Sequence, residues 1–250
     1  MATFGVIIAA AGRSIRFGDS SYKKPFAPLA GRAVWMHSAE RFLDRPDVGQ
    51  VVIVIAPDQR ESFLETFGAN LAFMGITLAE GGEQRCDSVR NGLLKLKSEV
   101  DYVAIHDAAR PCLASTWIDA VFTVAQKTGA AILATPVVST LKRVTDDMRI
   151  VDTVDRSGLW EAQTPQVFRR EILERAFEIA ESADDVSPAT DESMLVERSG
   201  HPVFVVRGSP MNIKITSRED LRHAERVLDA LPRPRLSAPD HPFADDDRWR

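Results

Sequence analysis

The feature that most constrains the fold is an apolar run that ends in small residues near the N-terminus. Residues Phe4–Ala9 form a continuous apolar stretch, and Ala10, Ala11 and Gly12 follow it directly. Four cations come soon after: Arg13, Arg16, Lys23 and Lys24. Small residues let the backbone approach a ligand closely, and cations suit a polyphosphate. The pattern predicts a strand that opens into a phosphate-binding loop of an α/β protein, the alternative being an ordinary connection with exposed basic residues.

This loop matches neither of two common nucleotide-binding motifs. It lacks the Gly-Lys-Ser/Thr ending of a Walker A loop. Gly12 and Gly18 are too far apart for the dinucleotide fingerprint, and no helix follows at once. A nicotinamide-dependent oxidoreductase is therefore disfavoured.

Strand-like and helix-like segments alternate along the chain. Further apolar strands are expected at Val51–Ala56, Tyr102–His106, Ala131–Thr135 and Val203–Arg207. Helical spacing of apolar residues is seen around residues 35–42, 63–67 (a short helix), 89–96, 117–124, 170–182 and 190–199. Ser217 and Asp220 resemble a capping box for a last helix. This alternation predicts an α/β fold with a mainly parallel sheet and helices on both faces.

We expect a single domain over residues 1–231. Residues 232–250 contain four prolines and the run Asp245–Asp247. That composition favours a disordered tail.

The alternation breaks between residues 136 and 160. Two β-branched, half-polar runs flank Asp146 and Asp147, which predicts a hairpin that protrudes as a β-arm. Such an arm often forms a lid or a subunit contact. Thr140 and Arg156 lie on its two sides and would suit a phosphate monoester, because arginine can bind phosphate through two hydrogen bonds. The alternative is an exposed hairpin with ordinary surface charges.

A second candidate segment surrounds Gly81 and Gly82. Two glycines after a strand precede Arg85 and Ser88. Backbone groups beside glycines can reach a base or ribose that side chains would block. The alternative is an ordinary turn with a helix N-cap at Asp87 or Ser88.

Asp107 comes directly after the expected strand Tyr102–His106 and is followed by small residues. Ligands of open α/β sheets bind at the carboxyl ends of strands, so Asp107 is well placed to bind Mg²⁺ on a triphosphate. We expect His106 to be structural, and Arg110 either to pair with Asp107 or to orient the loop. Lys214 alternates with apolar neighbours on an expected strand; if it points inward, it needs an anionic partner.

The composition excludes some classes of partner. The net charge of the 250-residue chain is −5, which disfavours a general nucleic-acid binder. No apolar run reaches the roughly 18 residues that a membrane span requires. The two cysteines, Cys86 and Cys112, are too sparse for a disulfide scaffold, and we see no signal peptide. We therefore expect a cytoplasmic protein.

Taken in order, these segments resemble the family of cytidylyltransferases that act on 2-C-methyl-D-erythritol 4-phosphate, in the non-mevalonate route to isoprenoids. The resemblance covers Phe4 to about Leu231. Its most specific pieces are AAG with Arg16, GGEQRCDSV, HDAARP, TVDRSGLWEAQTPQ, Thr190–Glu192 (TDE) and NIKIT.

The resemblance implies a Rossmann-like fold, a homodimer locked by the β-arm, and transfer of a cytidylyl group from CTP with release of pyrophosphate. It implies that CTP is held by Ala10, Ala11, Gly12, Gly82, Arg85 and Ser88. Arg16, Lys24 and Lys214 would surround the triphosphate and stabilise the transition state, with Asp107 as the Mg²⁺ ligand. Thr140 and Arg156 would grip the methylerythritol phosphate from the arm of the neighbouring subunit, and Arg110 and Thr164 would line its pocket.

The sequence departs from the family pattern at three places. Ser14 stands where a second glycine is common. Pro25 follows Lys24 instead of preceding the loop lysine, so Lys23 competes for the role of Lys24. Ser139 replaces an acid before the arm threonine, which keeps open another acceptor such as ribitol 5-phosphate. A different class of function also stays open, that of a non-catalytic nucleotide-binding module. Such a module would bind CTP without releasing pyrophosphate.

Overall fold

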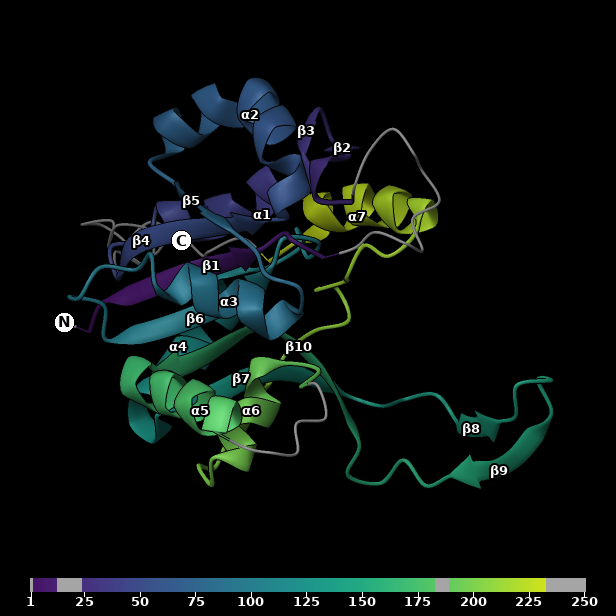
Figure 1. Cartoon of the computed structure of the whole chain (residues 1–250). Helices are drawn as coiled ribbons and strands as arrows, with labels where there is room; N and C mark the ends of the chain where they lie inside the picture. Colours follow the sequence, from purple (N-terminus) through teal and green to yellow (C-terminus); the bar gives the residue numbers. More distant parts are fainter. Residues whose placement is uncertain (1, 13–23, 183–188, 233–250) are drawn as a thin grey trace, which may run out of the picture.

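The fold is organised around a seven-stranded sheet. A computed structural model of the chain describes residues 2–12, 24–182 and 189–232 (Figure 1). The strand order is β11-β7-β10-β6-β1-β4-β5. The strands are β1 (Phe4–Ala9), β4 (Val48–Ile55), β5 (Thr77–Glu80), β6 (Tyr102–Asp107), β7 (Ala130–Pro136), β10 (Trp160–Arg169) and β11 (Phe204–Arg207). Of these described strands only β10 runs antiparallel to its neighbours, which confirms the expected Rossmann-like, mainly parallel α/β sheet.

Helices cover both faces of this sheet. Buried residues of α1 (Val34–Leu43), α2 (Arg60–Met74) and α4 (Ser115–Thr128) pack with one face, and those of α3 (Arg85–Leu93), α5 (Arg170–Ser182) and α6 (Glu192–Arg198) pack with the other. Successive side chains of a strand point to opposite faces. In β1, Val6 and Ile8 accordingly belong to the first core, whereas Ile7 belongs to the second.

The C-terminal helix α7 (Arg218–Ala230) builds a third, smaller core. It contributes Ala224, which packs with Leu29 and with the fully buried Cys112. Leu29 lies in the short hairpin of β2 (Pro28–Leu29) and β3 (Arg32–Ala33). The 3-10 turn η2 (Lys24–Phe26) precedes this hairpin, and a second one, η3 (Pro57–Gln59), precedes α2. The predicted capping box is confirmed, because Ser217 and Asp220 bond each other's backbone amides.

Three expectations about secondary structure were wrong or incomplete. Strand β10 is absent from the elements predicted by the sequence pattern. Pro165 cannot donate a ladder hydrogen bond, and it falls in a break of register between Ala162 and Gln166. Residues 212–216 form no strand; they run as an irregular segment that Ile215 fastens through its N–H to the carbonyl of Ala109. Helix α2, expected to be short, has 15 residues.

The predicted hairpin is confirmed. Strands β8 (Leu141–Val144) and β9 (Ile150–Val154) pair antiparallel in a separate two-stranded sheet and project away from the body (Figure 1). The arm and its base expose large apolar side chains: Val138, Val144, Met148, Ile150, Val151, Leu159 and Trp160.

No helix in the described part of the chain is long and apolar enough to span a bilayer. Apart from its first residue, the expected tail lies outside the described residues.

Candidate active site

The site lies where two neighbouring parallel strands end. Ala9 closes β1 and pairs in register with Asp107, which closes β6. From β1 the chain builds β4 and β5 on one side and then crosses to β6 on the other. The carboxyl ends of β1 and β6 therefore mark the topological switch point of the sheet, which is where open α/β sheets bind ligands.

A cavity of about 380 Å³ opens beside these strand ends. It is lined by Ala9, Ala11, Gly12, Ala56, Pro57, Asp58, Gly82, Glu83, Gln84, Arg85 and Ser88. Five of the six residues expected around CTP are among them. The sixth, Ala10, is buried behind the wall, where its N–H donates to the carbonyl of Val54.

The two glycines of the second segment allow a tight turn against α3. A Cβ on Gly81 would lie 2.6 Å from Cβ of Ala11, and one on Gly82 would lie 2.3 Å from Cβ of Asp87. The Gly82 N–H donates to the hydroxyl of Ser88 at 3.1 Å. The N-cap of α3 is Gln84, rather than Asp87 or Ser88, and its N–H donates to the Asp87 carboxylate. The segment therefore forms a turn in the cavity wall, but the expected N-cap at Asp87 or Ser88 is wrong, and the binding of a base or ribose stays a prediction.

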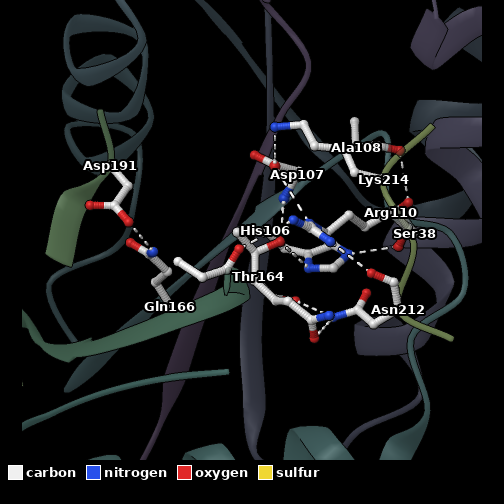
Figure 2. Close-up of polar contacts among 12 residues, drawn as sticks. Ser38, His106, Asp107, Ala108, Arg110, Thr164, Gln166, Asp191, Asn212 and Lys214 are labelled. Carbon is white, nitrogen blue, oxygen red and sulfur yellow. Dashed lines mark hydrogen bonds and ion pairs between the residues drawn. The ribbon is translucent and has the colours of Figure 1, made fainter. Parts of the chain in front are cut away.

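Asp107 is the anionic centre of a cluster of cations (Figure 2). Its Oδ2 lies 2.7 Å from Nζ of Lys214 and 3.7 Å from Nε of Arg110, and its Oδ1 lies 3.4 Å from Nη2 of Arg85. Burial alone would raise the pKa of Asp107, but the charges of Lys214, Arg85 and Arg110 outweigh it and hold the pKa well below its usual range. The carboxylate is thus ionised, and it is the anionic partner that an inward Lys214 was expected to need.

A buried hydrogen-bond network fixes the end of β6. The Thr164 hydroxyl accepts from the Asp107 N–H and bonds Nδ1 of His106, both at 3.0 Å. Nε2 of His106 bonds the Arg110 carbonyl at 3.0 Å. Burial lowers the pKa of His106 to about 4, so the ring is neutral. His106 is structural, as expected, and the Thr164 side chain is itself buried beneath the site.

Arg110 both pairs with Asp107 and ties the irregular segment at Asn212 to strand β10. Its Nη1 donates to the Asn212 carbonyl at 2.7 Å and its Nη2 to the Ala162 carbonyl at 3.4 Å. Asn212 is fully buried, and its Nδ2 donates to Oε1 of Gln163 and to the Thr164 carbonyl. This anchors the segment that carries Lys214, two residues further on.

Two residues of this site were given no role from the sequence. Glu192 is fully buried and both of its carboxylate oxygens accept hydrogen bonds from Nη1 of Arg85. Asn212 has the bonds just described. Each stands in a segment singled out above, Thr190–Glu192 and NIKIT, but only the tertiary contacts reveal what it holds.

The arm residues lie apart from this cluster. Thr140 is exposed in the loop before β8, and Arg156 donates to the Val138 carbonyl within the arm. Among the described residues, neither contacts Asp107 or its cations. Arg16 and Lys23 lie outside the described residues, and Lys24 begins η2.

Asp107 is the acidic side chain of this cluster that could bind a metal ion. The described residues contain no group of three or more histidine, cysteine or acidic side chains that could hold a metal on its own. Asp107 contributes one carboxylate, and within the described part of the chain its Oδ1 has only the long contact with Arg85. Mg²⁺ is often bound through one or two carboxylates together with substrate phosphates, so Asp107 fits a Mg²⁺ that arrives on a triphosphate.

Known proteins resemble this chain over almost all of its described length. The sequence model of the 2-C-methyl-D-erythritol 4-phosphate cytidylyltransferase family matches residues 4–230. The enzyme of that name from Rhodopirellula baltica is 42% identical over 238 residues, which cover 91% of this chain and 95% of the relative. The one from Pelotomaculum thermopropionicum is 41% identical over 225 residues, covering 90% and 93%.

Solved structures of the same enzyme share the fold. The crystal structure of the Francisella tularensis enzyme has a TM-score of 0.76 at 31% identity and covers 91% of this chain and 100% of its own. The Thermus thermophilus enzyme has a TM-score of 0.73 at 28% identity, covering 92% and 100%. The family match over nearly the whole described chain and the identity of its relatives establish that this chain belongs to the 2-C-methyl-D-erythritol 4-phosphate cytidylyltransferase family.

Proposed function

We propose that the chain transfers the cytidylyl group of CTP to 2-C-methyl-D-erythritol 4-phosphate, giving 4-diphosphocytidyl-2-C-methyl-D-erythritol and pyrophosphate. Membership of the family makes it a nucleotidyltransferase. The observation that carries the proposal is the convergence of Lys214, Arg85 and Arg110 on Asp107, beside a cavity that the glycine segments line. These residues come from three distant segments, yet they meet at the switch point of the sheet.

The reaction needs alignment and charge stabilisation more than proton transfer. A phosphate oxygen of the acceptor attacks the α-phosphorus of CTP in line, the bond to the β-phosphate oxygen breaks, and pyrophosphate leaves. The attacking oxygen is already anionic at neutral pH, so no general base is required. Ala10, Ala11, Gly12, Gly82, Arg85 and Ser88 would hold the nucleotide, and Arg16, Lys24 and Lys214 would stabilise the charge that develops on the phosphates.

Asp107 is the proposed Mg²⁺ ligand. A bound Mg²⁺ would neutralise charge on the triphosphate oxygens. Asp107 also holds Lys214 at the site, because the two side chains form an ion pair. The Lys214 side chain is 46% exposed, so its ammonium group remains accessible to a triphosphate.

We infer that the acceptor phosphate is held by Thr140 and Arg156 of a second subunit, with Arg110 and Thr164 on the near side. Two features support a homodimer through the arm. The arm stands away from the body, and it exposes apolar side chains, of which Val138 and Met148 are each 77% exposed. Large exposed apolar patches mark interaction surfaces.

A pyrophosphate-release assay tests the proposed function. Four nucleoside triphosphates are each combined with 2-C-methyl-D-erythritol 4-phosphate, ribitol 5-phosphate and other polyol phosphates, with and without Mg²⁺. The fastest turnover is expected with CTP, 2-C-methyl-D-erythritol 4-phosphate and Mg²⁺. Preference for ribitol 5-phosphate would replace the acceptor, and CTP binding without pyrophosphate release would indicate a non-catalytic module.

A further inference from the structure

Glu192 is a buried acid that the reaction described above does not use. It begins α6, is 0% exposed, and accepts from Nη1 of Arg85 through both carboxylate oxygens. Taking a charge out of water is costly unless it is paired, and a buried ion pair adds little net stability compared with apolar residues of similar size. The pair is therefore better explained by what it orients than by stability.

The first turn of α6 is fastened to the sheet. Asp191 caps the helix by accepting from the Met194 N–H at 3.0 Å. Its other carboxylate oxygen accepts from Nε2 of Gln166 at 2.8 Å (Figure 2). Oε1 of Gln166 accepts from the Ser193 N–H at 3.1 Å. Gln166 lies in β10 opposite Ile105 of β6. Glu192 is thus held at a defined position relative to the strand that ends in Asp107.

Arg85 lies between two acids and is bound unequally by them. Its Nη1 is held by Glu192, whereas its Nη2 reaches Oδ1 of Asp107 only at 3.4 Å. Guanidinium groups bind carboxylates most strongly with two parallel hydrogen bonds. If Glu192 were absent, Asp107 would be the one acid among the described contacts of Arg85, and Arg85 would turn toward it and leave the cavity wall.

We propose that Glu192 is a positioning residue for nucleotide binding, which holds the Arg85 guanidinium at the cavity wall and limits its approach to Asp107 to the single 3.4 Å contact. The inference rests on the proposed function, because it takes the cavity to be the CTP site. It assigns a role to the third residue of the TDE segment. It also requires that Glu192 act on the nucleotide through Arg85 alone.

The test compares Glu192→Gln with Glu197→Gln, an exposed acid on the same helix that undergoes the same change of charge. CTP binding is measured by calorimetry without acceptor, and KM is measured for both substrates. Glu192→Gln is expected to weaken CTP binding about tenfold, because Arg85 loses a charged hydrogen-bond partner. The KM for CTP should rise while the KM for the acceptor stays the same, and Glu197→Gln should match the wild type.

A double-mutant cycle with Arg85→Gln separates positioning from general destabilisation. If Glu192 acts through Arg85, Glu192→Gln should have no further effect on CTP binding in the Arg85→Gln background. The proposal would be overturned if the two substitutions weakened CTP binding by factors that multiply in the double variant. It would also be overturned if Glu192→Gln bound CTP with wild-type affinity.

Glu192→Asp keeps the test decisive if the glutamine variant does not fold. This variant keeps the charge but shortens the side chain, so Arg85 should be drawn back from the cavity and CTP should bind more weakly; wild-type affinity would refute the role. A wild-type chain that binds no CTP would instead refute the proposed function itself.

Discussion

Nζ of Lys214 lies 2.7 Å from Oδ2 of Asp107, and this ion pair joins the segment before α7 to the end of β6. The contact places a cation at the switch point of the sheet without burying it completely. It also explains how a lysine in an irregular segment can be held at a site built by strands.

Replacing Lys214 with glutamine should lower kcat about 100-fold or more, because a donor aimed at developing charge typically contributes that much to the rate. The fold should survive, since the side chain is 46% exposed. Pyrophosphate release measures the rate, and thermal unfolding checks the fold. Lys127→Gln, at an exposed position of α4, is the matched control. Turnover close to that of the control would remove Lys214 from the reaction.

Two lysines that are adjacent in the sequence, Lys23 and Lys24, compete for one role. We expect Lys24→Ala to fold normally and to be slowed about 100-fold or more, and Lys23→Ala to be affected much less. Steady-state pyrophosphate release from the two variants decides between them. The reverse order would move the role to Lys23, and near-wild-type turnover in both would exclude a catalytic lysine in this pair.

The arm provides a test of shared sites. Arg156→Ala should raise the KM for the acceptor phosphate and leave CTP binding unchanged, because arginine is expected to bind the phosphate through two hydrogen bonds. If Arg156 acts on the neighbouring subunit, Arg156→Ala and Lys214→Gln chains should complement each other when mixed and reassembled. In such a dimer one site has both native residues, so part of the activity returns. A mixture no more active than its separate components would contradict a site shared through the arm.

Gly82→Ala should weaken CTP binding by about tenfold or more and destabilise the protein by about 1–3 kcal/mol, as overpacking typically does. The added Cβ would lie 2.3 Å from Cβ of Asp87, so the turn that forms the cavity wall must shift. Gly68→Ala is the control, because its Cβ meets nothing within 4 Å inside α2 and should be neutral or slightly stabilising. Calorimetry with CTP and denaturant unfolding measure both effects. Equal CTP affinity in the two variants would show that this turn does not shape the site.

Asn212→Asp should lower the free energy of unfolding by about 2–3 kcal/mol, the cost of leaving buried polar groups unpaired. The Asn212 amide donates to Oε1 of Gln163 and the carbonyl of Thr164, and a carboxylate would face both acceptors without a proton to give. Urea unfolding measures the loss, with Asn70→Asp in α2 as the control. Stability equal to that of the control would mean that these bonds are dispensable.

Much of the fold could be predicted because its signals are local. The apolar run Phe4–Ala9 is β1 to the residue, and Ser217 with Asp220 caps α7 as expected. Strand β10 escaped prediction because Pro165 interrupts its pattern, and it joins the sheet only by pairing with β6 and β7 on either side. Residues 212–216 read as a strand from alternation alone, but no neighbouring strand pairs with them among the described residues.

For the candidate site, the sequence by itself determined which chemical groups stand at the ends of β1 and β6: small residues, the acid Asp107 and nearby cations. Residue types and turn signals are encoded within a few positions, so they can be recognised without coordinates. Only the tertiary structure decided which charges meet, namely Lys214 with Asp107 and Arg85 with Glu192. Ion pairs and hydrogen bonds act over a few ångströms, and strand order, rather than distance along the chain, determines which side chains come that close.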